Sequence, residues 1–174
     1  DYDVCTSLPA MFFENTADIA DRGFLWERRD GAWQPVSGAR ARSDAAAIGN
    51  ALKSLGVAKG DRVALVSENR PEWLIADIGI MAAGAISVPA YITNQVSDHL
   101  HILRDSGAKG AIVSGPALAG NLLPAAREAG LEFIVSMAPL DAGTGDPAIH
   151  LWSDLIGAQD TALPDISGIS RSDT

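Results

Sequence analysis

The sequence is short of cysteine, of positive charge and of long apolar runs, and each shortage excludes a class of protein. Its 174 residues include one cysteine, Cys5, so no disulfide can form within the chain and a reducing compartment is expected. The 13 basic and 22 acidic residues leave a net charge of −9, which argues against nucleic acid as a partner. No apolar run approaches the length that spans a bilayer. These shortages predict a cytoplasmic protein without a transmembrane segment.

The beginning of the chain has no sign of a secretion signal. No basic segment followed by an apolar segment opens the sequence, so no signal peptide is expected. The first residue is Asp1, which predicts that the natural start lies upstream or was removed.

Motifs that bind phosphate are also missing. The P-loop pattern G-x-x-x-x-G-K-[ST] and the dinucleotide pattern G-x-G-x-x-G are both absent. The polar loop at residues 67–70 contains no glycine whose backbone could cradle an anion. No Ser-His-Asp set and no pair of catalytic carboxylates can be argued from spacing. We therefore expect no catalytic residue and no nucleotide-phosphate site within this stretch of chain.

The histidine spacing does not predict a metal site. His99 and His101 are two positions apart, which turns them to different faces of a helix, whereas a helical metal pair needs residues i and i+4. We expect two partly exposed helix histidines and no bound metal.

The stretch at residues 60–94 organises what the chain does contain. An apolar run at 63–66 has the length of an interior parallel strand. Pro71 fits the first position of a helix, and residues 72–84 are apolar on nearly every face. A second apolar run at 86–90 predicts the next strand. The stretch is therefore a predicted βαβ unit.

The rest of the chain repeats this alternation. Asp30-Gly31 predicts a hairpin between strands at 24–29 and 33–36. Helices are expected at 8–20, from an N-cap at Ser37 to 55, from an N-cap at Ser97 to 106, at 116–129 with a kink or a break at Pro124, and at 153–158. Further strands are expected at 111–114, 131–135 and 149–152.

This order of elements predicts the α/β class, with a mostly parallel sheet and helices on both faces. Five strands should form one sheet, with at least the first four parallel. Residues 1–158 are predicted to form one α/β subdomain, which includes the hairpin near 24–36. Residues 159–174 are rich in Ser, Asp, Gly and Pro without periodicity, which predicts a linker.

Several segments carry a resemblance to a known family. They are GDRVA at 60–64, NRPEW at 69–73, AAGAISVP at 82–89, YITN at 91–94, DHLHIL at 98–103 and SGA at 106–108. The first three resemble the N-terminal part of the adenylate-forming (AMP-binding) superfamily. The last three are similar to its long-chain fatty acyl-CoA synthetase branch.

The resemblance implies a ligase that activates a long-chain fatty acid with ATP as an acyl adenylate and transfers it to coenzyme A. ATP, magnesium and coenzyme A would serve the full-length enzyme, with none bound to this fragment. In the family, the phosphate loop comes soon after a stretch like 163–174, and the catalytic lysine lies much further on. The resemblance therefore implies a truncated fragment that is inactive alone, with 159–174 leading toward the missing loop.

One coenzyme A contact is implied within the chain. In acyl-CoA synthetases, the loop that leaves the strand like 86–90 helps to border the groove for the coenzyme A nucleotide. The matching positions are Ala90, Tyr91 and Ile92, although relatives often have small residues where Tyr91 stands. The Tyr91 ring either borders an adenine face or is buried and holds the turn, and both alternatives stay open.

The polar cluster beside this loop has ordinary explanations. Glu68 and Arg70 are expected to pair across the turn, and Trp73 is expected to anchor the core rather than to form a stacking platform.

Two other functions remain open. The first is a stand-alone, non-catalytic interaction module with a flavodoxin-like fold, and the second is a nucleotide-binding regulatory domain. The missing phosphate loop argues against the second, and the irregular segment 159–174 argues against the first. If the chain is a subdomain separated from its neighbour, an exposed apolar face should make it associate with itself as a homo-oligomer.

Overall fold

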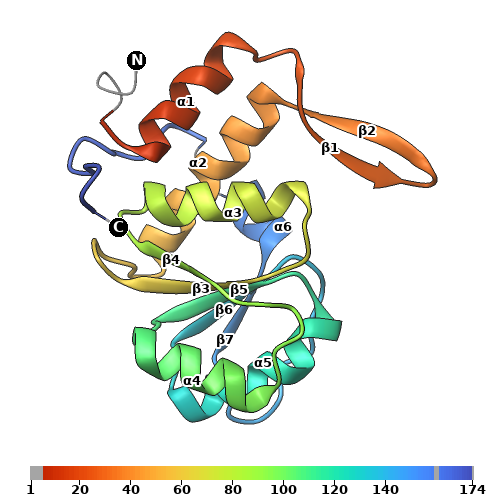
Figure 1. Cartoon of the computed structure of the whole chain (residues 1–174), viewed down its shortest axis with the longest axis vertical. Helices are drawn as coiled ribbons and strands as arrows, with labels where there is room; N and C mark the ends of the chain where they lie inside the picture. The colour runs from red at the N-terminus through yellow and green to blue at the C-terminus, as the bar shows by residue number, and fades with distance from the viewer. Residues whose placement is uncertain (1–5, 159–160, 174) are drawn as a thin grey trace.

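The computed structural model describes residues 6–158 and 161–173, which form a parallel sheet between two helical layers and a separate hairpin (Figure 1). Cys5 lies outside the described residues, so the expectation of a reducing compartment, which rests on this lone cysteine, stays a prediction.

The elements follow one another in the order that the sequence predicts. The helices are α1 (Leu8–Asp18), α2 (Gly38–Ser54), α3 (Pro71–Ala82), α4 (Val96–Ser106), α5 (Pro116–Ala129) and α6 (Trp152–Ala158). The strands are β1 (Gly23–Arg29), β2 (Ala32–Ser37), β3 (Arg62–Val66), β4 (Ile86–Pro89), β5 (Gly110–Val113), β6 (Phe133–Ser136) and β7 (Ala148–Leu151). Within the described ranges, no helix is both long and apolar enough to cross a bilayer.

The main sheet confirms the predicted α/β class. Its strand order is β4-β3-β5-β6-β7, and every neighbouring pair is parallel, including the fifth strand. The three inner strands are almost wholly buried because their side chains face helices on both sides of the sheet. β4 forms one edge of the sheet, and its last residue is Pro89. β1 and β2 form the expected antiparallel hairpin around Asp30-Gly31.

Two hydrophobic clusters occupy the two faces of the sheet. Helices α2, α3 and α6 lie on one face, with α1 packed outside α2 and α3, and α4 and α5 cover the other face (Figure 1). Ala41, Ala45, Ile48 and Leu52 form an apolar stripe along α2 that faces the first cluster, and all four are buried.

One expectation about a helix start was wrong, and one about a helix interior was wrong in part. The N-cap of α4 is Gln95, not Ser97, because Gln95 and Asp98 form a reciprocal capping box that starts the helix two residues earlier. Helix α5 continues through Pro124 rather than dividing there, while the alternative of a kink stays a prediction. Its buried residues Leu122 and Ala125 pack against the sheet on either side of the proline, which offsets the lost backbone hydrogen bond. Ser37 caps α2 as predicted.

One side chain from β3 binds the C-terminal end of α4. Arg62 donates through Nε to the Ser106 carbonyl at 2.6 Å and through Nη2 to the Gly107 carbonyl at 2.8 Å. These carbonyls belong to the last turn of a helix, where no backbone donor remains for them. Arg62 therefore joins the sheet to the end of α4.

Replacing Arg62 with Met is expected to lower the free energy of unfolding by about 2 kcal/mol, because hydrogen bonds to a charged donor are lost. Arg62→Lys should recover only part of the loss, since an ammonium cannot reproduce the guanidinium fork. Urea denaturation measures the effect, with Arg22→Met, at an exposed position, as the matched control. Equal stability of the Arg62 and Arg22 variants would contradict this role.

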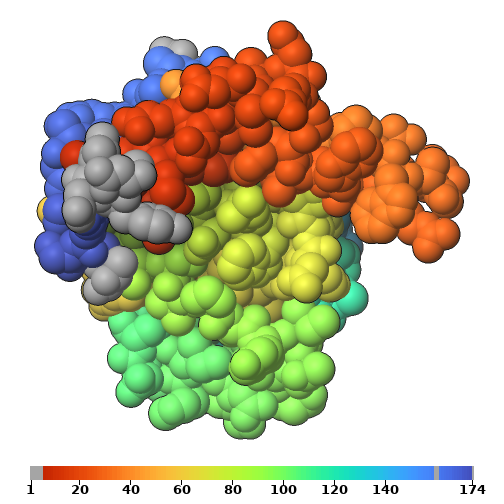
Figure 2. Space-filling model, turned by 45° about the horizontal axis from the view of Figure 1, so that its top comes forward, coloured from red at the N-terminus to blue at the C-terminus, as the bar shows by residue number. Residues whose placement is uncertain are grey.

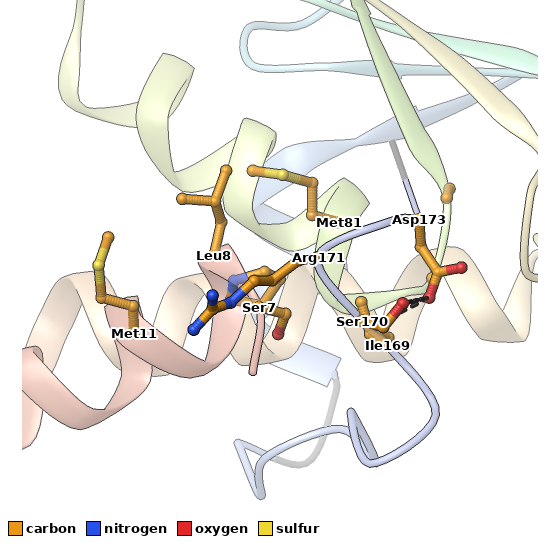
Figure 3. A pocket seen from close by; sticks show the side chains of 11 residues that line it. Ser7, Leu8, Met11, Met81, Ile169, Ser170, Arg171 and Asp173 are labelled. Atoms are coloured by element: carbon orange, nitrogen blue, oxygen red, sulfur yellow. Dashed lines mark hydrogen bonds between the residues drawn. The ribbon is translucent and has the colours of Figure 1, made fainter. Parts of the chain in front are cut away.

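The described part of the C-terminal segment, residues 161–173, contains no helix or strand but follows a fixed course. The Lys53 ammonium donates to the Asp165 carbonyl at 3.0 Å, and Lys59 donates to the Gly168 carbonyl at 2.7 Å. Lys59 also pairs with Asp173 at 2.9 Å. The end of the segment lies beside Leu8 and Met81 around an apolar cavity of about 250 Å³ (Figure 3). Its description as a linker stays a prediction.

Candidate functional site

A groove opens at the carboxyl end of the sheet, where two neighbouring loops part. The chain leaves β3 toward α3 on one face, whereas it leaves β4 toward α4 on the other face. Ligand crevices of open α/β sheets form where successive connections diverge in this way. The space, called the edge groove below, measures about 560 Å³. It is lined by Ser67, Glu68, Asn69, Trp73, Pro89, Ala90, Tyr91 and Ile92.

The loop after β4 has a well-supported backbone. The Ala90 N–H donates to the Leu65 carbonyl at 2.9 Å, which extends the pairing of β3 with β4. The Asn94 N–H donates to the Tyr91 carbonyl at 3.2 Å, and the Asn121 side chain of α5 donates to the Asn94 carbonyl at 3.1 Å. The loop is therefore fixed at its start, at its turn and at its end.

All three residues expected at a coenzyme A groove, Ala90, Tyr91 and Ile92, line the edge groove. The Tyr91 side chain is 81% exposed, so the alternative of a buried tyrosine that holds the turn is wrong. Backbone hydrogen bonds hold this turn instead, which leaves the ring free at the mouth of the groove. A flat, exposed ring on a fixed loop can stack against a planar ligand.

The opposite wall comes from the loop after β3. Ser67 is buried, and its hydroxyl donates to the Glu68 carbonyl at 2.9 Å. A hydrogen bond from the Ser114 side chain holds the pKa of the Glu68 carboxyl below its usual value. Glu68 is therefore an anion beside the groove, positioned by a residue at the end of the neighbouring strand β5.

The expected pair of Glu68 with Arg70 was wrong. Arg70 instead pairs with Glu72, with 2.8 Å between Nε and Oε2. Both residues lie at the first turn of α3, where Glu72 also meets the positive end of the helix. Burial raises the pKa of the Glu72 carboxyl, but the hydrogen bond and charge of Arg70, together with a backbone hydrogen bond, outweigh burial and leave the pKa lowered.

Trp73 belongs both to the core packing and to the wall of the edge groove, although from the sequence alone a core anchor and a stacking platform were alternatives. The side chain is half-buried and packs against the core cluster of the α3 face, as expected for an anchor. It also lines the edge groove. The groove therefore has one rigid aromatic wall and one exposed aromatic rim at Tyr91.

His99, at the start of α4, is buried with 2% of its surface exposed, so the expectation of two exposed histidines was wrong for it. Leu103, one turn later, is buried too, and both follow the inward face of the helix. His101 is exposed as expected. Burial lowers the pKa of His99 below its ordinary value of 6.5, and the neighbouring Asp98 opposes this shift only weakly.

Protein stability is expected to fall as the pH is lowered below 6.5. The reason is that His99 then binds a proton in the unfolded chain but stays neutral in the folded chain, where its pKa is lower. The decline should level off below the pKa of the folded state. Thermal denaturation from pH 7.5 to 5 measures it, and His99→Gln should flatten the profile. His101→Gln is the matched control and should leave the profile unchanged. If neither His99→Gln nor His101→Gln changes the pH dependence of thermal stability, a neutral, buried His99 would be contradicted.

The described residues contain no group of three or more His, Cys, Asp or Glu side chains that could hold a metal ion. Sequence reasoning missed Ser67, Asn69 and Ser114 as parts of the site or its support. The available signal was that all three lie at or within three residues of the end of a predicted interior strand, where parallel sheets gather their functional side chains.

Comparisons with known proteins agree with this architecture. Residues 12–160 match the profile of the AMP-binding enzyme family. The long-chain-fatty-acid–CoA ligase FadD15 of Mycobacterium tuberculosis is 39% identical over 102 residues, which are 59% of this chain and 17% of that ligase. The chain therefore spans about a sixth of the length of this curated relative.

Solved structures of CoA ligases are similar as well. The anthranilate CoA ligase AuaEII in complex with anthranoyl-AMP superposes with a TM-score of 0.76 at 26% identity, over 93% of this chain and 30% of that one. A benzoate CoA ligase from Burkholderia xenovorans shares the fold, with a TM-score of 0.72 at 23% identity, over 98% of this chain and 31% of that one. The resemblance to adenylate-forming enzymes is thus confirmed. Since the family profile covers residues 12–160 of the 174, the chain belongs to the AMP-binding enzyme family.

Proposed function

We propose that this chain is the N-terminal subdomain of an AMP-forming ligase that activates a long-chain fatty acid with ATP and transfers the acyl group to coenzyme A. Support for the fatty acid comes from the FadD15 ligase, whose identity exceeds that of the aryl-CoA ligase structures. The proposal places the reaction in the cytoplasm, where ATP and coenzyme A are available.

Within this ligase, the edge groove would take part of coenzyme A. The observation that carries this proposal is Tyr91, 81% exposed on a loop whose backbone is fixed. Its ring offers a stacking surface for adenine, while Ala90 and Ile92 supply small and apolar rims. Glu68 and Asn69, across the groove, can accept hydrogen bonds from amino or hydroxyl groups of the ligand.

The phosphate loop, the magnesium ligands and the catalytic lysine are assigned to segments of the ligase that this chain does not include. Residues 159–174 would then serve as the connection toward the phosphate loop. On this proposal the 174-residue chain has no activity of its own, and its contribution is to shape the site.

Substrate preference of the longer ligase tests the function directly. We expect palmitate to support AMP release with a much larger kcat/KM than benzoate or anthranilate. A preference for the aryl acids would retain the family but refute the fatty acid.

Replacing Tyr91 with Ala in the longer ligase is expected to raise the KM for coenzyme A about tenfold, since about 1.4 kcal/mol of stacking is lost from one substrate only. The KM values for ATP and fatty acid should stay unchanged. Tyr91→Phe is the matched control and should behave like the wild type, because it keeps the ring. If the KM for coenzyme A is the same in Tyr91→Ala as in the wild type, the ring does not stack on coenzyme A.

A further inference from the structure

The hairpin of β1 and β2 stands away from the rest of the molecule (Figures 1 and 2). In its register Trp26 lies opposite Pro35, and Arg28 lies opposite Trp33. Directly opposed residues share one face of an antiparallel ribbon, and so do residues two apart on a strand. These four side chains, called the tryptophan face below, therefore form one continuous surface.

The tryptophan face is strongly exposed. Trp26 is 55% exposed and Trp33 is 65% exposed, whereas Trp152 in the core is 5% exposed. A tryptophan buries about 150–250 Å² when it packs fully, so two exposed indoles leave a large apolar area in water. Tryptophan and arginine are the residues most enriched where protein interfaces concentrate their binding energy. The composition of this face is therefore that of an interface.

A hollow of about 540 Å³ separates this face from the loop after β3. Its lining includes the cation Arg28 and the anion Glu68. Within the part of the chain that the structure describes, the Arg28 guanidinium has no ion pair or hydrogen bond, and Glu68 has no ion pair. Four other charged side chains nearby form ion pairs within the chain, because Glu27 pairs with Arg29 and Arg70 pairs with Glu72.

An unpaired cation and an unpaired anion on one surface are complementary to a second copy of that surface. In a two-fold arrangement each copy presents its cation to the anion of the other, so every contact occurs twice. A nucleic acid would leave Glu68 facing phosphates, and a uniformly charged partner would satisfy only one of the two groups. The charge pattern therefore favours the same chain as the partner.

We infer that the tryptophan face and the adjoining hollow form a two-fold homodimer interface. The two indoles of each copy pack against those of the other, and Arg28 of one copy pairs with Glu68 of the other. This inference goes beyond the proposed ligase function, and the two proposals share one residue, because Glu68 lines both the edge groove and the hollow.

Sedimentation velocity and light scattering over a range of concentrations test the interface. The wild-type chain is expected to form dimers, and Trp33→Ser, Arg28→Glu and Glu68→Arg should each weaken the dimer by about tenfold or more. Combining Arg28→Glu with Glu68→Arg should restore association to within about threefold of the wild type, because the ion pair is rebuilt with reversed charges.

Two control variants change the same properties elsewhere on the surface. Arg22→Glu makes the same charge change at another exposed arginine, and Leu8→Ser removes an exposed apolar side chain at the start of α1. Neither should change association, and circular dichroism should show every variant folded. A monomer at all concentrations overturns the inference, and so does a dimer whose association is not weakened by Trp33→Ser. Failure of the charge reversal to restore binding overturns the Arg28–Glu68 pairing.

Discussion

Phe133→Ala is expected to lower the free energy of unfolding by about 3–5 kcal/mol, the largest loss of any substitution considered for this chain. Phe133 is 2% exposed on β6, and its ring lies over Gly110 of β5. A Cβ atom at Gly110 would lie 2.3 Å from the ring, so the ring fills the space that the glycine leaves. Removing the ring opens a cavity over the first residues of β5 and β6, in the hydrophobic cluster on the α3 face of the sheet.

Urea denaturation of a double-mutant cycle measures this contact. Gly110→Ala alone should cost about 1–3 kcal/mol by overpacking, but little in the Phe133→Ala background, where its methyl group enters the cavity. Leu163→Ala, at a residue 45% exposed, is the control and should change stability by less than about 0.5 kcal/mol. Additive losses at Gly110 and Phe133 would contradict the complementary packing.

Gly79→Val is expected to cost about 3 kcal/mol, because α2 and α3 approach too closely for a side chain at this position. A Cβ atom at Gly79 would lie 2.7 Å from Ile48 Cγ2 and 3.3 Å from the Ala45 carbonyl oxygen. The side-chain atom can be removed by mutation, but the backbone oxygen cannot. The substitution therefore forces the two helices apart, and the start of α3 beside the edge groove would shift with them.

The matching test combines Gly79→Val with Ile48→Ala. Each change alone should destabilise the fold, but together they should cost clearly less than the sum, because valine occupies volume that Ile48 vacates. Gly120→Val in α5 is the control, since no atom lies within 4 Å of a Cβ built there. That variant should be close to neutral. If Gly120→Val costs as much as Gly79→Val, helix propensity rather than close packing explains the loss.

The βαβ unit could be predicted from the sequence because its information is local. The apolar run of β3, Pro71 at the start of α3 and Gly84 after its end each specify backbone geometry within a few residues. The position of the edge groove followed from the same facts, since the carboxyl ends of parallel strands share one edge. The fold class and the position of the groove were therefore predictable together.

The details that the sequence did not predict depend on distant partners. Glu68 is held by Ser114, which is 46 positions away, so a search for neighbouring charges found Arg70 instead. Burial of His99 depends on which face of α4 meets the sheet. Exposure of Tyr91 depends on the absence of any described side chain above the loop, which no periodicity encodes. Such features belong to tertiary packing rather than to local pattern.

Pro89 at the end of β4 has a consequence for the chain before and during folding. The Ala90 N–H points inward to Leu65, so the nitrogen of Pro89 points toward the open edge, where it has no hydrogen to donate. Pro35 has the same effect in β2, the second strand of the hairpin. A foreign strand that approaches either edge meets an incomplete ladder and cannot propagate a cross-β stack. The two prolines therefore disfavour edge-to-edge pairing between copies of this chain.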